Sequence, residues 1–318
     1  MKFRTELTPS PSRRKIDPRG RVLLLGSCFS ENIGRKMAES RWNVTVNPTG
    51  VLFNPASIAI TLTAAMLPAA QRQSLLQHTL TERDGAWVSW LSDASTAGLT
   101  PAECFEKCMA GFDNLREALL EADTVILTWG TAFMYSLNEG GPEMVVANCH
   151  KHPASEFTRR RASVGEIADT TSRIVNALRT VRPDLRIIIT VSPVRHLADG
   201  AAENSRSKAT LLLAAEQLCE ILEDVEYFPS FELMNDDLRD YRFYAADLCH
   251  PSEEGVEYIW EKFRDCYLSD KGRELSERGA ELTRREHHRS QIPGSKSDIR
   301  FREETERLLK EWESNKAH

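Results

Sequence analysis

The sequence predicts a three-layer α/β/α sandwich around a central, mostly parallel sheet. Short apolar runs alternate with longer segments of helical periodicity, turn-forming residues separate them, and no internal repeat is present. Continuous apolar runs of about four to eight residues are typical of strands covered on both faces. In such folds ligands bind at the carboxyl ends of the strands, so the residues that follow each strand are the ones to inspect for function.

The first strands and helices lie near the start of the chain. Residues 21–25 form an apolar run that ends at a glycine, which predicts a buried strand. Residues 30–40 place their apolar side chains on one helical face. A second strand, 42–46, ends at the turn sequence Asn-Pro-Thr-Gly, and residues 56–66 have apolar positions at i, i+3 and i+4, which predicts a helix.

The middle of the chain breaks this alternation. Residues 72–98 are interpreted as an insertion, with a short strand at 86–91 that follows a hairpin turn at an Asp-Gly pair. A proline then starts a long helix with apolar positions from 101 to 119. The next buried strand is expected at 124–128.

The same patterns complete the domain. The remaining expected elements are a short extra strand at 144–147, a helix at 164–181, a strand at 185–191, a helix at 205–223, a strand at 225–228 and a helix from 252 to about 267. We therefore divide the chain into an irregular lead-in (1–20), one α/β domain (21–268) that carries the insertion, and a helical extension (269–318).

Composition excludes several classes of protein. The chain has 318 residues, 41% of them apolar and 28% charged, which is ordinary for a globular protein. Its net charge of −6 argues against a general affinity for nucleic acid. It has no apolar run of the roughly 20 residues that a membrane span needs, and its start lacks the apolar core of a secretory signal. Seven cysteines without a CxxC pair favour a reduced, cytoplasmic protein.

The extension 269–318 is rich in charge of both signs, with 12 Lys and Arg residues and 11 Asp and Glu residues. A Pro-Gly pair separates two segments that each carry a weak apolar stripe. Two helices laid over the surface of the domain are the main expectation. A homodimer that forms through these helices is the alternative.

Two motifs carry the chemistry. Ser27 lies at the turn between the first strand and its helix, where backbone N–H groups point toward a developing oxyanion; the alternative is a serine that only caps the helix. Cys28 is a rival nucleophile, since thiols at helix N-termini have lowered pKa values.

Asp247 and His250 follow the last strand and can pair with a nucleophile from another loop, unless they are a structural pair. His196 is a rival base, but it lacks an aspartate three residues before it.

Two further loops are candidates for substrate contacts. Residues 148–153 hold an asparagine, a cysteine and two histidines; we expect a substrate wall or a plain polar loop and no metal, because no standard zinc spacing is present. Arg195 can hold a carboxylate or phosphate with its planar guanidinium, or form an ion pair with Asp199 or Glu203.

Gly26, Ser27, Cys28 and Phe29 are similar to the signature of the GSCFA domain family, which itself resembles the SGNH/GDSL hydrolases. The resemblance covers roughly residues 20–268. The stretches that support it are 47–55, 129–132, 148–151, 192–196 and 247–251.

The resemblance implies a flavodoxin-like SGNH hydrolase fold with Ser27 as nucleophile, His250 as general base and Asp247 as the acid that orients it. It favours Ser27 over Cys28, which would then pack beneath the turn. It also implies an oxyanion hole made by the N–H groups of Ser27 and Gly50.

The third donor of that hole, an asparagine in SGNH enzymes, is replaced in this chain by Ala132. Asn148 is the expected substitute and Thr131 the second choice. Thr131, His150, Arg195 and His196 are the expected substrate contacts.

These residues predict a serine hydrolase that cleaves an ester through an acyl-enzyme and needs no cofactor. The expected substrate is a small-molecule ester, with an acyl group on a carbohydrate suggested by the wider SGNH relatives. An acyltransferase that uses the same triad is one alternative. A non-catalytic binding or regulatory protein on the same scaffold is another, favoured by the missing asparagine and the charged extension.

Overall fold

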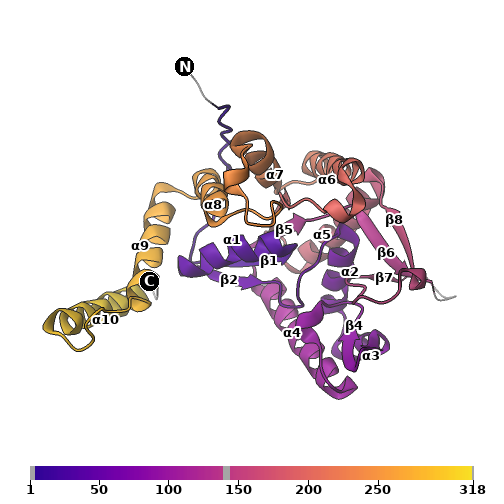
Figure 1. The fold of residues 1–318 in the computed structure, drawn as a ribbon, viewed down its shortest axis with the longest axis horizontal. Helices are drawn as coiled ribbons and strands as arrows, with labels where there is room; N and C mark the ends of the chain where they lie inside the picture. The colour runs from indigo at the N-terminus through magenta and orange to yellow at the C-terminus, as the bar shows by residue number, and fades with distance from the viewer. Residues whose placement is uncertain (1–3, 139–143, 317–318) are drawn as a thin grey trace.

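The computed structural model describes residues 4–138 and 144–316, so the outermost residues of the predicted lead-in and extension lie outside it. Its centre is a parallel five-stranded sheet in the order β10-β9-β5-β1-β2 (Figure 1). This is the flavodoxin-like order of a doubly wound sheet, and the predicted fold class is confirmed. The strands are β1 (Arg21–Gly26), β2 (Asn43–Val46), β5 (Thr124–Trp129), β9 (Arg186–Val191) and β10 (Val225–Phe228).

Helices cover both faces of the sheet. Leu23 and Leu25 of β1 pack into one apolar cluster with helices α2, α4, α5 and α6, and the intervening Leu24 packs into another with α1 and α8. All three leucines are completely buried, as a strand covered on both faces requires. The helices are α1 (Cys28–Glu39), α2 (Pro55–Met66), α4 (Pro101–Glu121), α5 (Val164–Val181), α6 (Ala201–Ile221) and α8 (Glu253–Tyr267).

The expected insertion contains the expected hairpin, formed by β3 (Leu80–Arg83) and β4 (Ala86–Ser89) around the Asp-Gly turn. It also contains a helix that the sequence did not predict, α3 (Ala69–His78), whose residues are mostly polar.

A second, three-stranded antiparallel sheet lies beyond the end of β5 (Figure 1). Its order is β7-β6-β8, and only its shortest strand, β7 (Val145–Val146), was expected. The other two strands are β6 (Phe133–Leu137) and β8 (Phe157–Arg161). The three arginines at the end of β8, residues 159–161, pair with β6 through their backbones, and Arg159 and Arg161 are exposed. This small sheet carries the residue 148–153 loop toward the carboxyl edge of the main sheet.

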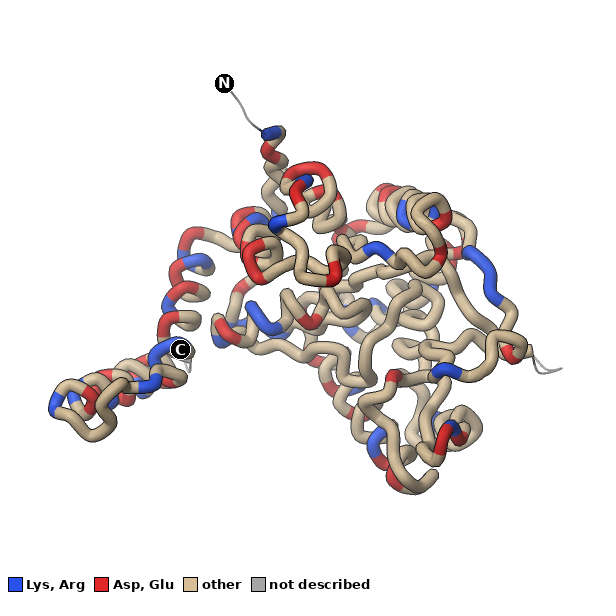
Figure 2. Tube along the Cα trace, viewed as in Figure 1, with Lys and Arg blue, Asp and Glu red and all other residues tan. Residues whose placement is uncertain are grey.

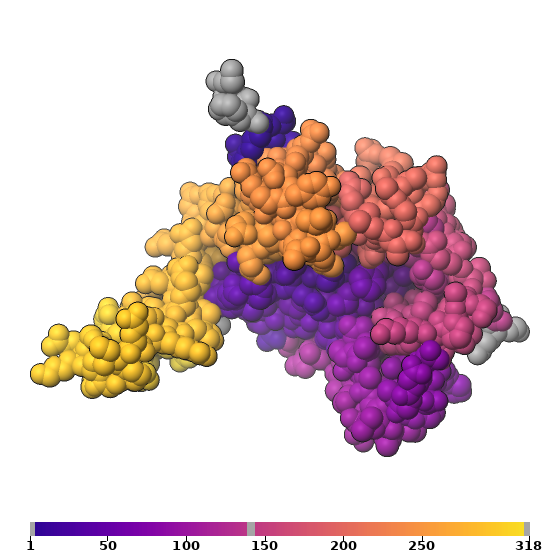
Figure 3. Space-filling view, in the orientation of Figure 1, coloured from indigo at the N-terminus to yellow at the C-terminus, as the bar shows by residue number. Residues whose placement is uncertain are grey.

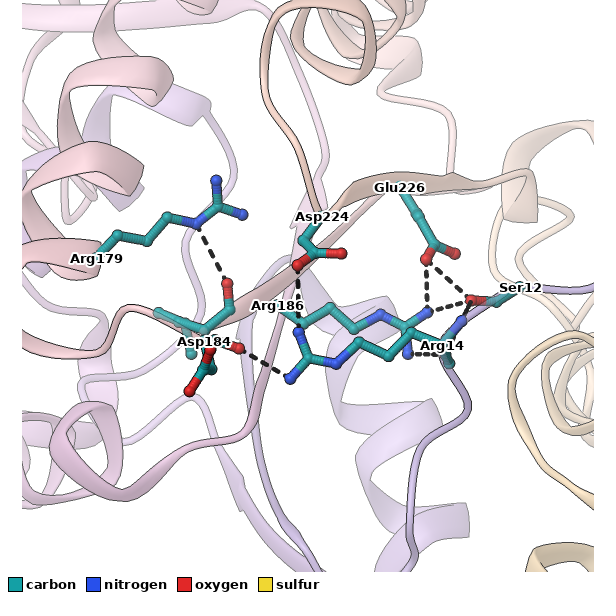
Figure 4. A network of polar contacts seen from close by, with 8 residues as sticks. Ser12, Arg14, Arg179, Asp184, Arg186, Asp224 and Glu226 are labelled. Carbon is teal, nitrogen blue, oxygen red and sulfur yellow. Dashed lines mark hydrogen bonds and ion pairs between the residues drawn. The ribbon is translucent and has the colours of Figure 1, made fainter.

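The lead-in has no helix or strand among its described residues, yet it is fixed to the domain (Figure 4). The Arg186 guanidinium of β9, 1% exposed, donates to Ser12 Oγ at 2.6 Å and to Glu226 Oε1 at 2.9 Å. The backbone N–H of Ile16 donates to the carbonyl of Tyr267 at the end of α8. Residues 12–16 therefore tie the last strands and the last helix of the domain together.

The extension forms α9 (Asp270–Glu286) and α10 (Lys296–Lys316). α9 lies against the end of α1, where Trp42 Nε1 donates to Ser276 Oγ at 3.1 Å. α10 packs on α9 and extends away from the domain (Figures 1 and 3). The expectation of helices laid over the surface is therefore right for α9 and wrong for α10.

Charges of both signs follow one another along α9 and α10 (Figure 2). The homodimer through these helices stays a prediction. Within residues 4–138 and 144–316, no helix is both long enough and apolar enough to span a membrane.

Candidate active site

Two loops meet at the carboxyl edge of the sheet, as the fold class predicts. One is the turn from β1 into α1, and the other is the loop that precedes α8. His250 from the second loop lies with its Nε2 3.5 Å from Cys28 Sγ in the first. On the other side of the ring, His250 Nδ1 lies 2.6 Å from Asp247 Oδ2. The structure thus forms a chain of contacts from thiol to imidazole to carboxylate.

Asp247 folds its own loop into a tight turn. Its Oδ1 accepts the backbone N–H groups of Cys249 and His250, both at 2.9 Å. These bonds and the bond to the His250 ring lower the pKa of Asp247 to about 2, so it is a carboxylate at neutral pH. A carboxylate only accepts, so Nδ1 of the ring carries a proton, and the neutral form of this ring has its Nε2 lone pair directed at Cys28. The two side chains are 46% and 53% exposed, which leaves the pair open to a substrate.

Ser27 has the helix-capping role that the sequence analysis held as the alternative. Its Oγ accepts the N–H of Phe29 at 3.4 Å, its carbonyl accepts the N–H of Ser30, and the residue is 1% exposed. In the described part of the chain its hydroxyl makes no hydrogen bond to His250. The expected pairing of Ser27 with His250 is therefore not formed, and the partner of His250 is the neighbouring Cys28.

The reason is local geometry. Serine is a preferred N-cap, and a cap turns its hydroxyl back onto the first turn of its own helix. The next side chain, the first of α1, then points out of the turn. The N-cap preference of serine is the sequence signal for this orientation of the Ser27 hydroxyl.

The Cys28 thiol lies in a mixed environment. Burial and the nearby Glu31 carboxylate raise its pKa, and the N–H groups of Cys28 and Phe29 and the Lys208 ammonium offset part of that rise. The group is therefore a thiol at neutral pH and needs a base to become a nucleophile. The Cys28 N–H belongs to the first residue of α1, where it has no backbone acceptor among the described residues and lies beside its own sulfur, the place where an oxyanion would form.

The backbone donors expected for the oxyanion hole are used within the fold. The Ser27 N–H donates to the carbonyl of Thr128 at 3.1 Å, and the Gly50 N–H donates to the carbonyl of Asn47 at 2.8 Å. Gly50 is nonetheless required at its position, because its φ is +90° and a Cβ there would lie 2.2 Å from Asp93 Cγ. Its role in this structure is that of a turn residue.

A cavity of about 300 Å³ opens between the end of β5 and the small sheet. Thr131, Asn148 and His196 line it, whereas Ser27, Cys28, Asp247 and His250 are not among its lining residues. Asn148 also accepts the N–H of His150 through its Oδ1, at 2.8 Å. The other lining residues are Phe53, Asn54, Phe133, Tyr135, Val146, Ala147, Cys149, Arg159, Ala198 and Asp199.

Two of the expected substrate contacts lie elsewhere. His150 bonds through Nε2 to the carbonyl of Ser89 at 2.8 Å and is not part of the cavity wall. Arg195 directs Nε to Asn235 Oδ1 at 3.2 Å and Nη1 to Asn204 Oδ1 at 3.4 Å. The ion pair expected between Arg195 and Asp199 or Glu203 is not formed, because Asp199 pairs with Arg159 and Glu203 pairs with other arginines.

A buried lysine lies behind the site. Lys208 of α6 is 1% exposed and donates to the carbonyls of Gly130 and Ser192, both at 2.7 Å. Burial lowers the pKa of this ammonium to about 7, with the Arg195 charge adding to the effect. It joins the carboxyl ends of β5 and β9 directly under the cavity. Nothing in the sequence pattern marked this lysine, because a single Lys on a helix is usually exposed.

No group of three or more His, Cys, Asp or Glu side chains lies close enough to hold a metal ion in the described ranges.

Comparison with known proteins shows the family of this chain. The model of the GSCFA family matches residues 21–263, about three-quarters of the sequence and all of the α/β domain up to the middle of α8. The chain belongs to the GSCFA family. The resemblance stated from the sequence is thereby confirmed.

Solved structures similar to this GSCFA chain are distant. A carbohydrate esterase family 3 protein from Talaromyces cellulolyticus shares 10% identity, with 82% of this chain and 99% of that chain covered and a TM-score of 0.34. An acetyl xylan esterase, Est2A, from Butyrivibrio proteoclasticus shares 11% identity, with 82% and 64% covered and a TM-score of 0.32. Both are too distant to carry a functional argument. No curated protein matches the chain significantly.

Proposed function

We propose that this GSCFA protein is an esterase-type acyl-transfer enzyme whose nucleophile is Cys28, with His250 as general base and Asp247 as its orienting carboxylate. One observation carries the proposal: Cys28 Sγ, the His250 ring and Asp247 Oδ2 are in sequential contact, at 3.5 and 2.6 Å. This is the geometry of a nucleophile, a base and a third group that orients the base.

The proposed reaction is ester hydrolysis in two steps, with an acyl-thioester on Cys28 as the intermediate. His250 Nε2 takes the thiol proton, and the sulfur electron pair forms a bond to the carbonyl carbon of the ester. The resulting oxyanion accepts the Cys28 N–H at the positive end of α1. Collapse of this intermediate expels the alkoxide, which takes the proton from His250, and an acyl-thioester remains on Cys28. Water, deprotonated by His250, then attacks the thioester carbonyl; the C–S bond breaks, the acid leaves, and the Cys28 sulfur takes the proton back from His250.

The cavity beside the site indicates the size of substrate. A volume of about 300 Å³ lies at the lower end of the range for small-molecule sites. Its wall combines aromatic rings with Asn148 and the Arg159–Asp199 ion pair, a mixture that suits a small polar ester such as an acylated sugar. An alcohol in place of water in the last step would make the same site an acyltransferase.

The test is covalent labelling with p-nitrophenyl acetate, followed by peptide mass spectrometry. We expect an acetyl group on Cys28 that is lost in Cys28→Ala, slowed in His250→Gln and kept in Ser27→Ala. Cys149→Ala is the matched control, because this partly buried thiol lines the neighbouring cavity, makes no contact with His250 among the described residues and has its pKa raised to about 11 by burial.

Two results would contradict the proposal. An acetyl group on Ser27 would return the nucleophile to the serine that the sequence analysis favoured. No acetylation of folded protein would favour the binding protein on this scaffold.

A further inference from the structure

The proposed reaction lacks a second donor for its oxyanion. The Cys28 N–H has no backbone acceptor among the described residues and lies beside its own sulfur, whereas the N–H groups of Ser27 and Gly50 are bonded within the fold. Ala132 has no side-chain donor, and its own N–H donates to Ser207 Oγ at 2.8 Å. A side chain that reaches the start of α1 from another element is therefore needed to complete the hole.

His196, which follows β9, is placed to do this. Gly130 shows where its ring lies: a Cβ built on Gly130 would be 3.3 Å from His196 Nε2 and 3.4 Å from Ser27 Cβ. The imidazole nitrogen and the residue just before Cys28 thus lie against the same face of one glycine. The ring is held there edge-on to Phe53, with centroids 5.6 Å apart and planes at 88°. The same imidazole lines the cavity, so it borders both the reacting end and the substrate wall.

The charge state of His196 suits a donor. Burial, the most important cause, and the Lys208 ammonium lower its pKa to about 4, against a smaller opposing effect of Asp199. The ring is therefore a neutral imidazole at neutral pH, and as a base it is far weaker than an ordinary histidine. A neutral imidazole can donate one N–H to an oxyanion without giving up its proton, which is how a neutral histidine polarises a carbonyl in other enzymes.

We propose that His196 donates its Nε2–H to the oxyanion formed on attack by Cys28, together with the Cys28 N–H. The role rests on the proposed function, because it needs the tetrahedral intermediate of that reaction. It replaces the donor that Ala132 cannot supply. It also explains Gly130, since any side chain there would enter the space between His196 and the start of α1.

The experiment compares two reagents on Cys28, each followed by mass spectrometry of the labelled peptide. Iodoacetamide alkylates the thiol without an oxyanion, and p-nitrophenyl acetate acylates it through one. The variants are His196→Phe, which keeps a ring but has no donor, and His196→Gln, whose amide nitrogen reaches the position of Nε2. His152→Phe is the matched control, because His152 lies against Trp90 and outside the cavity wall.

We expect His196→Phe to slow acylation by about 100-fold or more, the usual effect of removing one oxyanion donor, and to change alkylation less than threefold. His196→Gln should recover most of the acylation rate, which a base or a purely structural group would not allow. Slower acylation with an unchanged KM for the ester would place the effect in the transition state.

The outcomes separate the two proposals. If alkylation of Cys28 does not depend on His250, or wild-type Cys28 is not acylated, the proposed function fails and His196 has no oxyanion to bind. If the wild type behaves as expected but His196→Phe slows both reagents equally, or neither, the His196 proposal alone is overturned. If Asn148→Ala shows the acylation-specific loss and His196→Phe does not, the donor is Asn148.

Discussion

His196 makes the stability of this protein depend on pH in a way that the structure quantifies. Its pKa is about 4 in the folded chain and 6.5 in the unfolded chain, so the unfolded state binds more protons between those values. The stability that depends on this group is fully present above pH 6.5 and is lost as the pH falls toward 4. From pH 7.5 to pH 5.0 the loss due to His196 alone amounts to about 2 kcal/mol.

The perturbation is His196→Gln, which fills the same space with a group that does not titrate. We expect the wild type to lose about 2 kcal/mol more of its unfolding free energy than the variant between pH 7.5 and pH 5.0. Urea unfolding followed by circular dichroism at both pH values gives the four free energies needed, and groups common to both proteins cancel in the comparison. Equal losses in the two proteins would show that the imidazole is not buried as neutral, and would refute the reasoning.

Three other perturbations test separate parts of the structure. The unfolding free energy of the wild type should rise by about 2 kcal/mol from pH 7 to pH 9, because the pKa of Lys208 is about 7 in the folded chain and 10.5 in the unfolded chain. In Lys208→Met this rise should be absent. Equal rises in the two proteins, measured by urea denaturation, would contradict the lowered pKa of the buried lysine. Glu226→Ala should lower the unfolding free energy, measured with urea, by about 3 kcal/mol, because it leaves the buried Arg186 guanidinium without its carboxylate (Figure 4). A loss below about 1 kcal/mol would mean that the hydrogen bond to Ser12 is enough to stabilise the buried charge. Gly130→Ala should slow acylation of Cys28 more than its alkylation, because the new Cβ would lie 3.0 Å from the Phe53 carbonyl and 3.3 Å from His196 Nε2; equal effects on both reactions would count against the His196 donor.

The main sheet could be predicted because its signals are local. An apolar run such as residues 21–25 is a buried strand wherever it pairs, and its glycine end marks the functional edge. β6 and β8 escaped prediction because they are short, mix polar and apolar residues, and pair residues that are 20 to 28 positions apart in the sequence. Their existence depends on tertiary contacts that no short segment encodes.

Within the candidate site, too, contacts made inside one loop could be predicted from the sequence, and contacts between separate elements could not. Asp247 and His250 are three residues apart and form their contact within one loop, so their spacing predicted it. Which of Ser27 and Cys28 faces that loop depends on the rotation of the first turn of α1, which the capping bond of the serine sets. His196 was an expected substrate contact because it follows a strand, but its position against Gly130 and the burial of Lys208 depend on how separate elements pack, which no local pattern indicates.

The contacts of residues 12–16 with the last helix have a consequence for synthesis. The guanidinium of Arg186 in β9 is buried and has two partners that are far apart in the sequence. Ser12 comes from the lead-in, and Glu226 comes from β10. The carbonyls of Cys266 and Tyr267 accept the N–H groups of Ser12 and Ile16. Residues 12–16 therefore cannot dock until the end of α8 has been synthesised. Closure of so long a loop makes docking of residues 12–16 a late event in folding, so these residues stay undocked while the strands and helices between them and α8 are being synthesised.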